Sequence, residues 1–440
     1  MGKKSVLLLV ALLCLLSVSL LAEKIVVTYA NWNLGLQIEN RIIEEFEKAH
    51  PDIDVQLAEN MDYANYLDSL AAAAAAGKLP DVIMIPNIPL ALNNEWALNI
   101  ADMVADDPQW QKVPAPIREA TVYGNGVYAI PAGMYFMGYF VNDDLFDTYN
   151  QPRLDFAPTW QQFYSAVRQL TIPADKVLGL AEEVQIPEWY PAALNSDFSW
   201  FTWDGEKYNL AGSEFINAVR LAKQIFNSRY VFDALSPEEK EAMNAGWYGE
   251  VWDQGKIAIR WAGTWDINSF KNLPFPTRFI GVPGGRLPVV GDFMVISRTA
   301  ANPEAAYAFA RYVTFGLDGI EKRMEIDEKV EWVSMPLTTD EEILQKYFEF
   351  RKAYVGLEEA YGVIGNGIIE GVKIVPGYVA SRWTAPTGLK IGDNENANIG
   401  DVIWQAMRGA VNISDYAAQL NELANREYQK AAEVIAQLTD

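Results

Sequence analysis

The stretch Ala71–Ile85, AAAAAAGKLPDVIMI, decides the fold because it ends a helix and begins a strand within one short segment. Alanine is the strongest helix former, and Gly77 can adopt the left-handed conformation that closes a helix. The apolar run Val82–Ile85 that follows is typical of a strand. The sequence therefore predicts a helix over 63–76, a C-terminal cap at Gly77 and a strand over 82–85.

The same alternation of strand and helix extends back to residue 25. Residues 25–29 form a short β-branched run, and apolar residues alternate over 53–57 as in a strand. Between them, apolar residues recur over 38–49 at the spacing of one helix face. Strand, helix, strand, helix, strand implies a parallel sheet with crossovers, which is the beginning of a doubly wound α/β lobe.

Ligands of such sheets bind beyond the carboxyl ends of the strands. The residues at these positions are polar or aromatic: Asn31, Trp32 and Asn33 after the first strand, Glu59 and Asn60 after the second, and Pro86 and Asn87 after the third. Neutral hydrogen-bonding groups and a flat ring suit a polar, uncharged ligand better than a phosphate.

The middle and the end of the chain are richer in helix. Helices are expected over 159–170, 213–227, 237–244, 303–314 and 413–437, and a strand over 257–260. These segments predict a second α/β lobe closed by helices. Gly124 and Gly126 resemble part of a dinucleotide motif, but Asn125-Gly126 between alternating valine and tyrosine predicts a hairpin turn instead.

Charge and composition exclude several classes of protein. The 440 residues carry a formal net charge of −23, which disfavours nucleic acid and anionic lipid as partners. The chain has a single histidine, His50, and a single cysteine, Cys14, so a two-histidine zinc site cannot form and no disulfide, metal or other cofactor is expected. A Ser-His-Asp triad would require His50, which is interpreted as a surface residue at a turn before Pro51.

Residues 1–22 have the pattern of a secretory signal peptide. Lys3 and Lys4 precede an apolar run, and Ala22 supplies a small residue at the cleavage site. Two alternatives stay open: the run is nearly long enough for a retained membrane anchor, and Cys14 could carry a lipid, although Leu13 stands where a lipoprotein signal favours a small residue. The mature chain is expected in the periplasm or outside the cell, either free or lipid-anchored.

Several phrases along the chain, taken in order, resemble those of the extracellular solute-binding proteins of bacterial ABC importers, in the sugar-binding group that includes maltose-binding protein. They are EEFEKAHPDIDVQL (44–57), AAAGKLPDVIMI (74–85), YAIPAGMYFMGYFVNDDLFD (128–147), APTWQQFYSAVRQLT (157–171), DQGKIAIRWAGTWD (253–266) and GDFMVISRTAANPEAAYAFARYV (291–313). Each phrase alone is a loose pattern, and the order and spacing from about residue 25 to 435 make the match specific.

The resemblance implies the two-lobed periplasmic-binding-protein fold, with a mostly parallel sheet and flanking helices in each lobe. The chain would cross between the lobes near Pro131, Gly291 and Pro336. Residues 23–131 and 291–340 would then form lobe 1, and residues 132–290 and 341–440 lobe 2.

The resemblance also implies ligand-binding residues at matching positions. Trp265 of AGTW matches an aromatic residue that stacks on a sugar ring, and Asp266 beside it either lines the cleft or caps the helix that follows. The other residues implied by position are Asn31, Trp32, Asn33, Asn87, Met134, Tyr135, Trp261 and Asp292. The aromatic clusters PEWY, SDFSWFTWDG and ASRWTAPTG add Glu188, Trp189, Trp200, Trp203 and Trp383, at least half of which should pack in the core.

The resemblance implies a monomeric receptor that is not an enzyme. It would capture a sugar or oligosaccharide between its lobes and deliver it to the transmembrane permease subunits of an importer with a cytoplasmic ATPase. Two alternatives stay open. A secreted glycoside hydrolase also has a tryptophan-lined cleft and needs only two carboxylates, and the same fold could carry a non-sugar solute.

Overall fold

The computed structural model describes residues 24–32, 37–58, 61–351, 354–392 and 394–439. Residues 1–22 with Cys14, as well as Asn33, Asn60 and Glu59, lie outside the described residues. In the described part of the chain, no helix combines the length and the apolar composition needed to cross a bilayer.

The N-terminal alternation of strand and helix is confirmed. Strand β1 (Ile25–Ala30) pairs in parallel with β2 (Ile53–Leu57) and with β3 (Val82–Ile85). The connections are α2 (Gln37–Ala49) and α3 (Tyr66–Ala75). The second helix is shorter than predicted because its first three residues form a separate 3-10 turn, and Gly77 adopts a positive φ of 66° just past its end.

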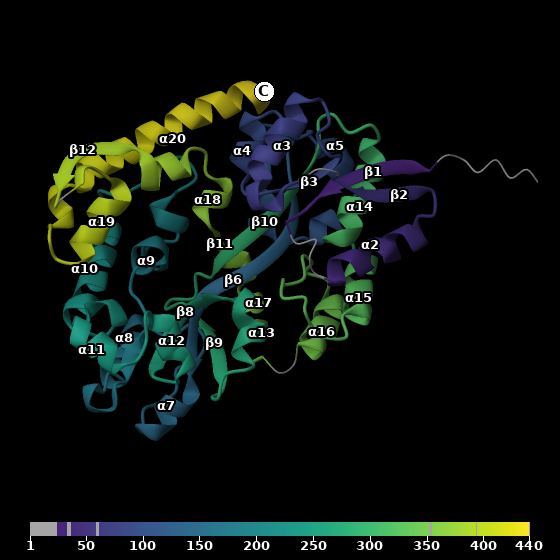
Figure 1. The fold of residues 1–440 in the computed structure, drawn as a ribbon. Coiled ribbons are helices and arrows are strands. Elements are labelled where there is room, and N and C mark those ends of the chain that lie inside the picture. The colour runs from purple at the N-terminus through teal and green to yellow at the C-terminus, as the bar shows by residue number, and fades with distance from the viewer. Residues whose placement is uncertain (1–23, 33–36, 59–60, 352–353, 393, 440) are drawn as a thin grey trace, which may run out of the picture.

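The longest strand joins two groups of strands, which we call the two halves of the molecule: β1 to β3 with β10 (Pro288–Ile296) in the first half, and β7 (Leu178–Leu180), β8 (Ile257–Gly263) and β9 (Thr277–Gly281) in the second. The first half of β6 (Ile130–Asn142) pairs with β10, and its second half pairs with β8 and β9. The strand order is β2-β1-β3-β10-β6-β8-β7, and β11 (Ile368–Ile369) adds to β10. Figure 1 shows β6 running diagonally from one half to the other.

The α/β fold class is confirmed, and parallel and antiparallel pairs occupy different places. The outer pairs β1–β2, β1–β3 and β7–β8 are parallel, whereas β3–β10, β10–β6 and β6–β8 are antiparallel. Antiparallel pairing therefore occupies the centre of the sheet, where β10 and β6 lie side by side.

Because of the register of β6, the carboxyl ends of the strands in one half face those of the strands in the other half. Ile85 at the end of β3 lies opposite Phe293 of β10, which lies opposite Pro131 of β6, so β3 runs in the same direction as β6. Gly263 at the end of β8 lies opposite Met137, and β8 runs against β6. The two strand ends therefore point toward the middle of β6 from opposite sides.

Helices cover both halves (Figure 1). Those predicted from periodicity are α8 (Trp160–Gln169), α10 (Ser213–Asn227), α11 (Pro237–Ala242), α14 (Pro303–Val313) and α20 (Ala417–Thr439). The others are α4 (Ile88–Asn93), α5 (Ala101–Ala105), α6 (Ala115–Glu119), α7 (Asp143–Thr148), α9 (Ile186–Leu194), α12 (Tyr248–Asp253), α13 (Ile267–Phe270), α15 (Leu317–Ile326), α16 (Glu341–Phe350), α17 (Leu357–Gly362), α18 (Gly371–Ile374) and α19 (Ile399–Met407).

The predicted hairpin is present, with its turn one residue earlier than expected. Strand β4 (Val122–Tyr123) pairs with β5 (Gly126–Val127), and Tyr123 lies opposite Gly126. The two-residue loop is thus Gly124-Asn125, and Gly124 has a positive φ of 54°. Glycine at the first loop position suits the turns that match strand twist.

Two hydrophobic clusters form the core, and α20 reaches both. Leu420, Leu423 and Ala424 near its start belong to the cluster around β8, α9 and α10, whereas Ile435 near its end belongs to the cluster around β1, β3 and α4. The hydroxyl of Tyr128 donates to the carbonyl of Thr439 at 3.4 Å. The last helix therefore spans the two halves, as the yellow ribbon in Figure 1 shows.

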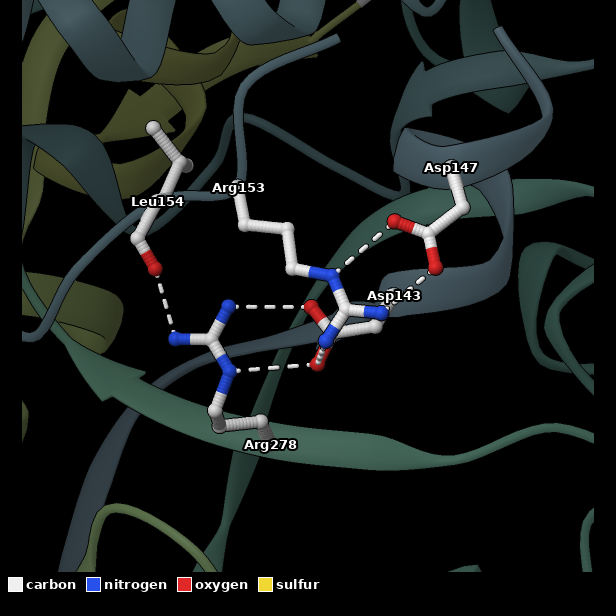
Figure 2. Close-up of polar contacts among 5 residues, drawn as sticks. All are labelled: Asp143, Asp147, Arg153, Leu154 and Arg278. Carbon is white, nitrogen blue, oxygen red and sulfur yellow. Dashed lines mark hydrogen bonds and ion pairs between the residues drawn. The ribbon is translucent and has the colours of Figure 1, made fainter. Parts of the chain in front are cut away.

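A saturated ion-pair cluster ties α7 to β9 (Figure 2). Asp143 at the start of α7 receives two hydrogen bonds from Arg278 of β9, at 2.9 and 3.2 Å. The remaining nitrogen of Arg278 donates to the carbonyl of Leu154 at 2.6 Å. Arg153 approaches Asp143 to 3.5 Å and pairs with the more exposed Asp147.

Candidate functional site

The middle of β6 is where both strand ends converge, and it brings three predicted residues together. Asn31, Tyr135 and Asp292 line one cavity, with Glu39, Arg323, Trp332 and Ser334 among the other lining residues. Burial, followed by the nearby Asp292 carboxylate, raises the pKa of Tyr135. The tyrosine hydroxyl therefore stays protonated and can donate a hydrogen bond.

Trp265 contacts one lining residue of this cavity from the other half of the molecule. It lies in the helical turn η6 (Thr264–Asp266), directly after β8, and is 42% exposed. Its ring meets the ring of Tyr135 edge-on, with centroids 5.8 Å apart. The Thr264 hydroxyl accepts from the backbone N–H of Phe136 at 3.1 Å and so fixes the turn to β6. An exposed indole is thus held where the two sets of strand ends converge.

Asp266 is half-buried beside Trp265, and burial raises its pKa. Although it stands at the N-terminus of α13, its side chain makes no capping hydrogen bond there. The nearest charge acting on it is that of Arg260, which lowers its pKa.

The residues after the first-half strands are engaged in local structure. The Asn31 amide donates to the Tyr29 hydroxyl at 2.5 Å, and Trp32 meets Tyr66 edge-on at 5.7 Å. Asn87 caps α4 by accepting from the backbone N–H of Leu90 at 2.8 Å. Asn33 lies outside the described residues. Of the described residues Asn31, Trp32 and Asn87, Asn31 lines the central cavity.

Met134 occupies a different position from its neighbour Tyr135. Its side chain is fully buried, and its backbone N–H donates to the Ser334 hydroxyl at 2.9 Å. Its carbonyl accepts from the N–H of Met335 at 2.7 Å. The side chain of Met134 therefore packs in the core while its backbone fixes the returning segment.

Glu188 and Trp383 meet in a second group of side chains in the other half. The Glu188 carboxylate pairs with Arg382 at 2.8 Å and accepts from the Tyr378 hydroxyl at 3.3 Å. Trp383 is 42% exposed and meets the Tyr378 ring edge-on, with centroids 5.2 Å apart. The Trp200 indole donates to the same hydroxyl at 3.0 Å.

The remaining predicted tryptophans lie in hydrophobic packing. Trp189 is fully buried against Tyr139 and Tyr190, and Trp261 is 8% exposed and packs edge-on against Tyr139. Trp200 is buried as well, and Trp203 packs against Tyr208 and Tyr428. In this conformation they are not gathered with Tyr135 and Trp265.

Two charged residues that the sequence did not predict, Glu370 and Lys373, connect the central cavity with the group around Glu188. Lys373 of α18 pairs with Asp292 at 3.0 Å, and the half-buried Glu370 lies within electrostatic reach of both Asp292 and Glu188. Burial is the main cause that raises the pKa of Glu370. Lys373 and Arg382 were missed because their partners lie 81 and 194 residues away in the chain, which no local pattern signals.

The described residues contain no group of three His, Cys, Asp or Glu side chains placed to hold a metal ion. His50 stacks on Phe46, with ring centroids 4.5 Å apart.

The family comparison and the structural comparison agree on the class of protein. The family model for bacterial extracellular solute-binding proteins matches residues 32–315. No curated protein matches the chain in sequence. Both the family and the solved structures below are binding proteins.

Solved structures share the fold at low sequence identity. An ABC substrate-binding protein of Listeria monocytogenes in complex with cycloalternan is 18% identical, with a TM-score of 0.68 over 92% of this chain and 98% of that one. The cyclic α-maltosyl-1,6-maltose binding protein of Arthrobacter globiformis is 13% identical, with a TM-score of 0.67 over 94% and 100%. A solute-binding protein of Thermotoga lettingae bound with α-D-tagatose is 16% identical, with a TM-score of 0.61 over 95% and 99%.

Proposed function

The chain belongs to the bacterial extracellular solute-binding protein family, and from this premise we propose that it captures a sugar or oligosaccharide between its two halves for an ABC importer. The observation that carries the proposal is the contact between Tyr135 and Trp265 where the two sets of strand ends converge. The similar structures whose titles name cycloalternan, a cyclic maltosyl-maltose and tagatose support a saccharide as the ligand class.

The chemistry of the site suits a saccharide. A pyranose has C–H faces that pack on an indole and hydroxyl groups that need both donors and acceptors. Trp265 and Trp383 supply exposed ring faces, and Asn31, Tyr135 and Asp292 supply polar groups at the convergence of the strands. A micromolar affinity requires about −8 kcal/mol, which stacked rings and several hydrogen bonds can provide after the costs of association.

The proposed mechanism is closure of two lobes about the crossing strands. Lobe 1 would comprise residues 23–131 and 291–340, and lobe 2 residues 132–290 and 341–440. A ligand that contacts both lobes only in the closed state shifts the open–closed equilibrium toward closure. The closed monomer would then dock on the permease subunits, whose cytoplasmic ATPase drives import, in the periplasm or at the outer face of the membrane.

We also propose that the captured sugar is bound without being transformed, because the matching family and the similar structures are binding proteins. Asp292 pairs with Lys373 and Glu188 with Arg382, so neither of these two carboxylates stands as a free acid or nucleophile. Glycoside hydrolysis needs two available carboxyl groups. Because Glu39 lines the cavity and Asp266 lies beside Trp265, an assay for released reducing ends decides between binding and hydrolysis.

Three measurements test the proposal. In a thermal-shift screen of mono- and oligosaccharides, a sugar that binds should raise the melting temperature of the protein, because a ligand that binds only the native state stabilises it by mass action. Small-angle scattering with the same sugar should show compaction, and no new reducing ends should appear during long incubation with oligosaccharides. A screen with no response, or the release of reducing ends, would contradict the proposal.

A further inference from the structure

An arginine without a protein acceptor lies among aromatic rings in the second half of the molecule. The guanidinium carbon of Arg260, on β8, is 5.3 Å from the ring centroid of Phe270 and 5.9 Å from those of Trp247, Tyr248 and Trp252. Trp247 is itself 48% exposed. The rings hold the side chain in place and leave one edge of the group open to solvent.

The hydrogen-bonding capacity of Arg260 is unused. No hydrogen bond or ion pair joins its guanidinium to any described residue, and its Nε is buried without a partner. An unpaired buried donor costs about 1–3 kcal/mol, so such groups are rare unless a ligand completes them. Arg278 and Arg382 in the same half of the molecule each pair with a carboxylate.

An acceptor stands beside this donor. Glu182 follows β7, and the backbone contact from Ala181 N–H to the Ile259 carbonyl, at 2.9 Å, places it next to Arg260. Its carboxylate accepts from the Tyr248 hydroxyl at 3.1 Å, and the Arg260 charge lies near enough to lower its pKa. Burial has the larger opposite effect and raises that pKa to about 7.

This cluster lies near the turn that carries Trp265. The Arg260 charge acts on Asp266, which is adjacent to Trp265, and the Trp265 ring contacts Tyr135, a residue that lines the central cavity. Both Glu182 and Trp265 follow the parallel strands β7 and β8, but β7 ends level with Ile259 whereas β8 continues to Gly263. A ligand that extends from Trp265 back along β8 would therefore meet Arg260 and Glu182.

We propose that Arg260 and Glu182 form a donor–acceptor pair that recognises neighbouring hydroxyl groups of an uncharged saccharide, and this inference rests on the proposed function. Arg260 donates to one hydroxyl oxygen, and Glu182 accepts from the next hydroxyl. A ligand carboxylate would meet the Glu182 and Asp266 carboxyl groups as well as the arginine, so a uronate is disfavoured.

The test measures affinity by titration calorimetry at pH 8. The saccharides are D-glucose, D-tagatose and maltotetraose, with D-glucuronate as the acidic counterpart of D-glucose. For whichever neutral saccharide binds, Arg260→Lys should weaken binding at least fivefold, because lysine keeps the charge but loses the planar fork. The matched control is Arg286→Lys, because Arg286 is half-buried and donates to the carbonyls of Ser196 and Phe198. The affinity of this variant for the saccharide should stay within twofold of the wild-type value.

A second readout separates recognition from a structural role. Glu182 faces the charged or titratable groups of Glu183, Asp233, Tyr248 and Arg260. If the ionised Glu182 accepts from the ligand, wild-type affinity should rise between pH 6 and pH 8, and Glu182→Gln should remove that rise. A structural effect would lower the melting temperature without changing this profile.

The outcomes distinguish the two proposals. Equal affinities of Arg260→Lys and wild type, a pH profile unchanged by Glu182→Gln, or preference for D-glucuronate over D-glucose would overturn the inference and leave the binding function standing. A wild-type protein that binds no saccharide would refute the proposed function together with the inference.

Discussion

Two arginines of the same half of the molecule show how differently a guanidinium can be used. Arg278 donates to both oxygens of Asp143 and to the Leu154 carbonyl, as Figure 2 shows, and neither side chain of the pair is more than 16% exposed. Arg260 has four aromatic neighbours and no acceptor among the described residues. A saturated guanidinium holds the fold together, and an unsaturated one on the face of a strand is available to a ligand.

Removing the acceptor of the saturated arginine should have the largest effect on stability. Asp143→Ala leaves Arg278 buried with only a carbonyl partner, so the free energy of unfolding should fall by about 3–5 kcal/mol. Urea unfolding at pH 7 measures the change. Asp147→Asn, which removes the exposed partner of Arg153, should change the free energy of unfolding far less, because solvent screens an exposed ion pair. A similar small cost for Asp143→Ala would show that the pair is not structural.

Removing the exposed indole at the opening should act on binding rather than on stability. Trp265→Ala should weaken saccharide affinity at least tenfold, equivalent to about 1.4 kcal/mol, because the sugar loses its stacking face. The matched control is Trp404→Ala, since Trp404 is also 42% exposed but lies on α19 over Arg408. Calorimetry should find its affinity unchanged. A lower melting temperature with normal affinity for Trp265→Ala would assign the indole to the core.

Neutralising the acid beside Arg260 should have a pH-dependent effect on stability. The pKa of Glu182 is about 7 in the folded protein, above its usual 4.5, so the folded state binds this proton more tightly and stability falls as pH rises between these values. Glu182→Gln removes this cost. Without ligand, the variant should match wild type near pH 4.5 and exceed it by about 1 kcal/mol at pH 8, since the side chain is partly exposed. Thermal melts at both pH values measure the difference, and a constant offset would contradict it.

The single histidine should matter least. His50 stacks on Phe46 outside the region where the strand ends converge, so His50→Ala should leave saccharide affinity unchanged and alter stability by less than about 1 kcal/mol. Calorimetry and thermal melts on one preparation check both expectations. A loss of affinity would reveal a coupling between this turn and the site.

Local patterns predicted the first part of the fold correctly. Residues 25–85 give strand, helix, strand, helix, strand because each element is specified by its own apolar periodicity. The division of β6 between two sets of partners has no such signature. Its residues 130–142 read as one apolar run, and only the pairing with β10 and β8 shows where the halves meet. The family resemblance implies a chain crossing near Pro131, and that boundary stays a prediction.

The candidate site was harder to predict because composition does not encode which face of an element is buried. Trp189, Trp261 and Trp265 looked alike in the sequence, yet only Trp265 is well exposed. Glu188 was proposed from the aromatic segment around it, and its partner Arg382 lies 194 residues further along the chain. Arg260 directly precedes Trp261, a predicted residue of the same motif, but is marked only by the rings that surround it in space.

The span of α20 across both hydrophobic clusters has a consequence for the order of folding. Leu420, Leu423 and Ala424 complete one cluster and Ile435 the other. Without residues 417–439, apolar surface would stay uncovered in both clusters. Neither cluster can therefore finish packing before this helix docks.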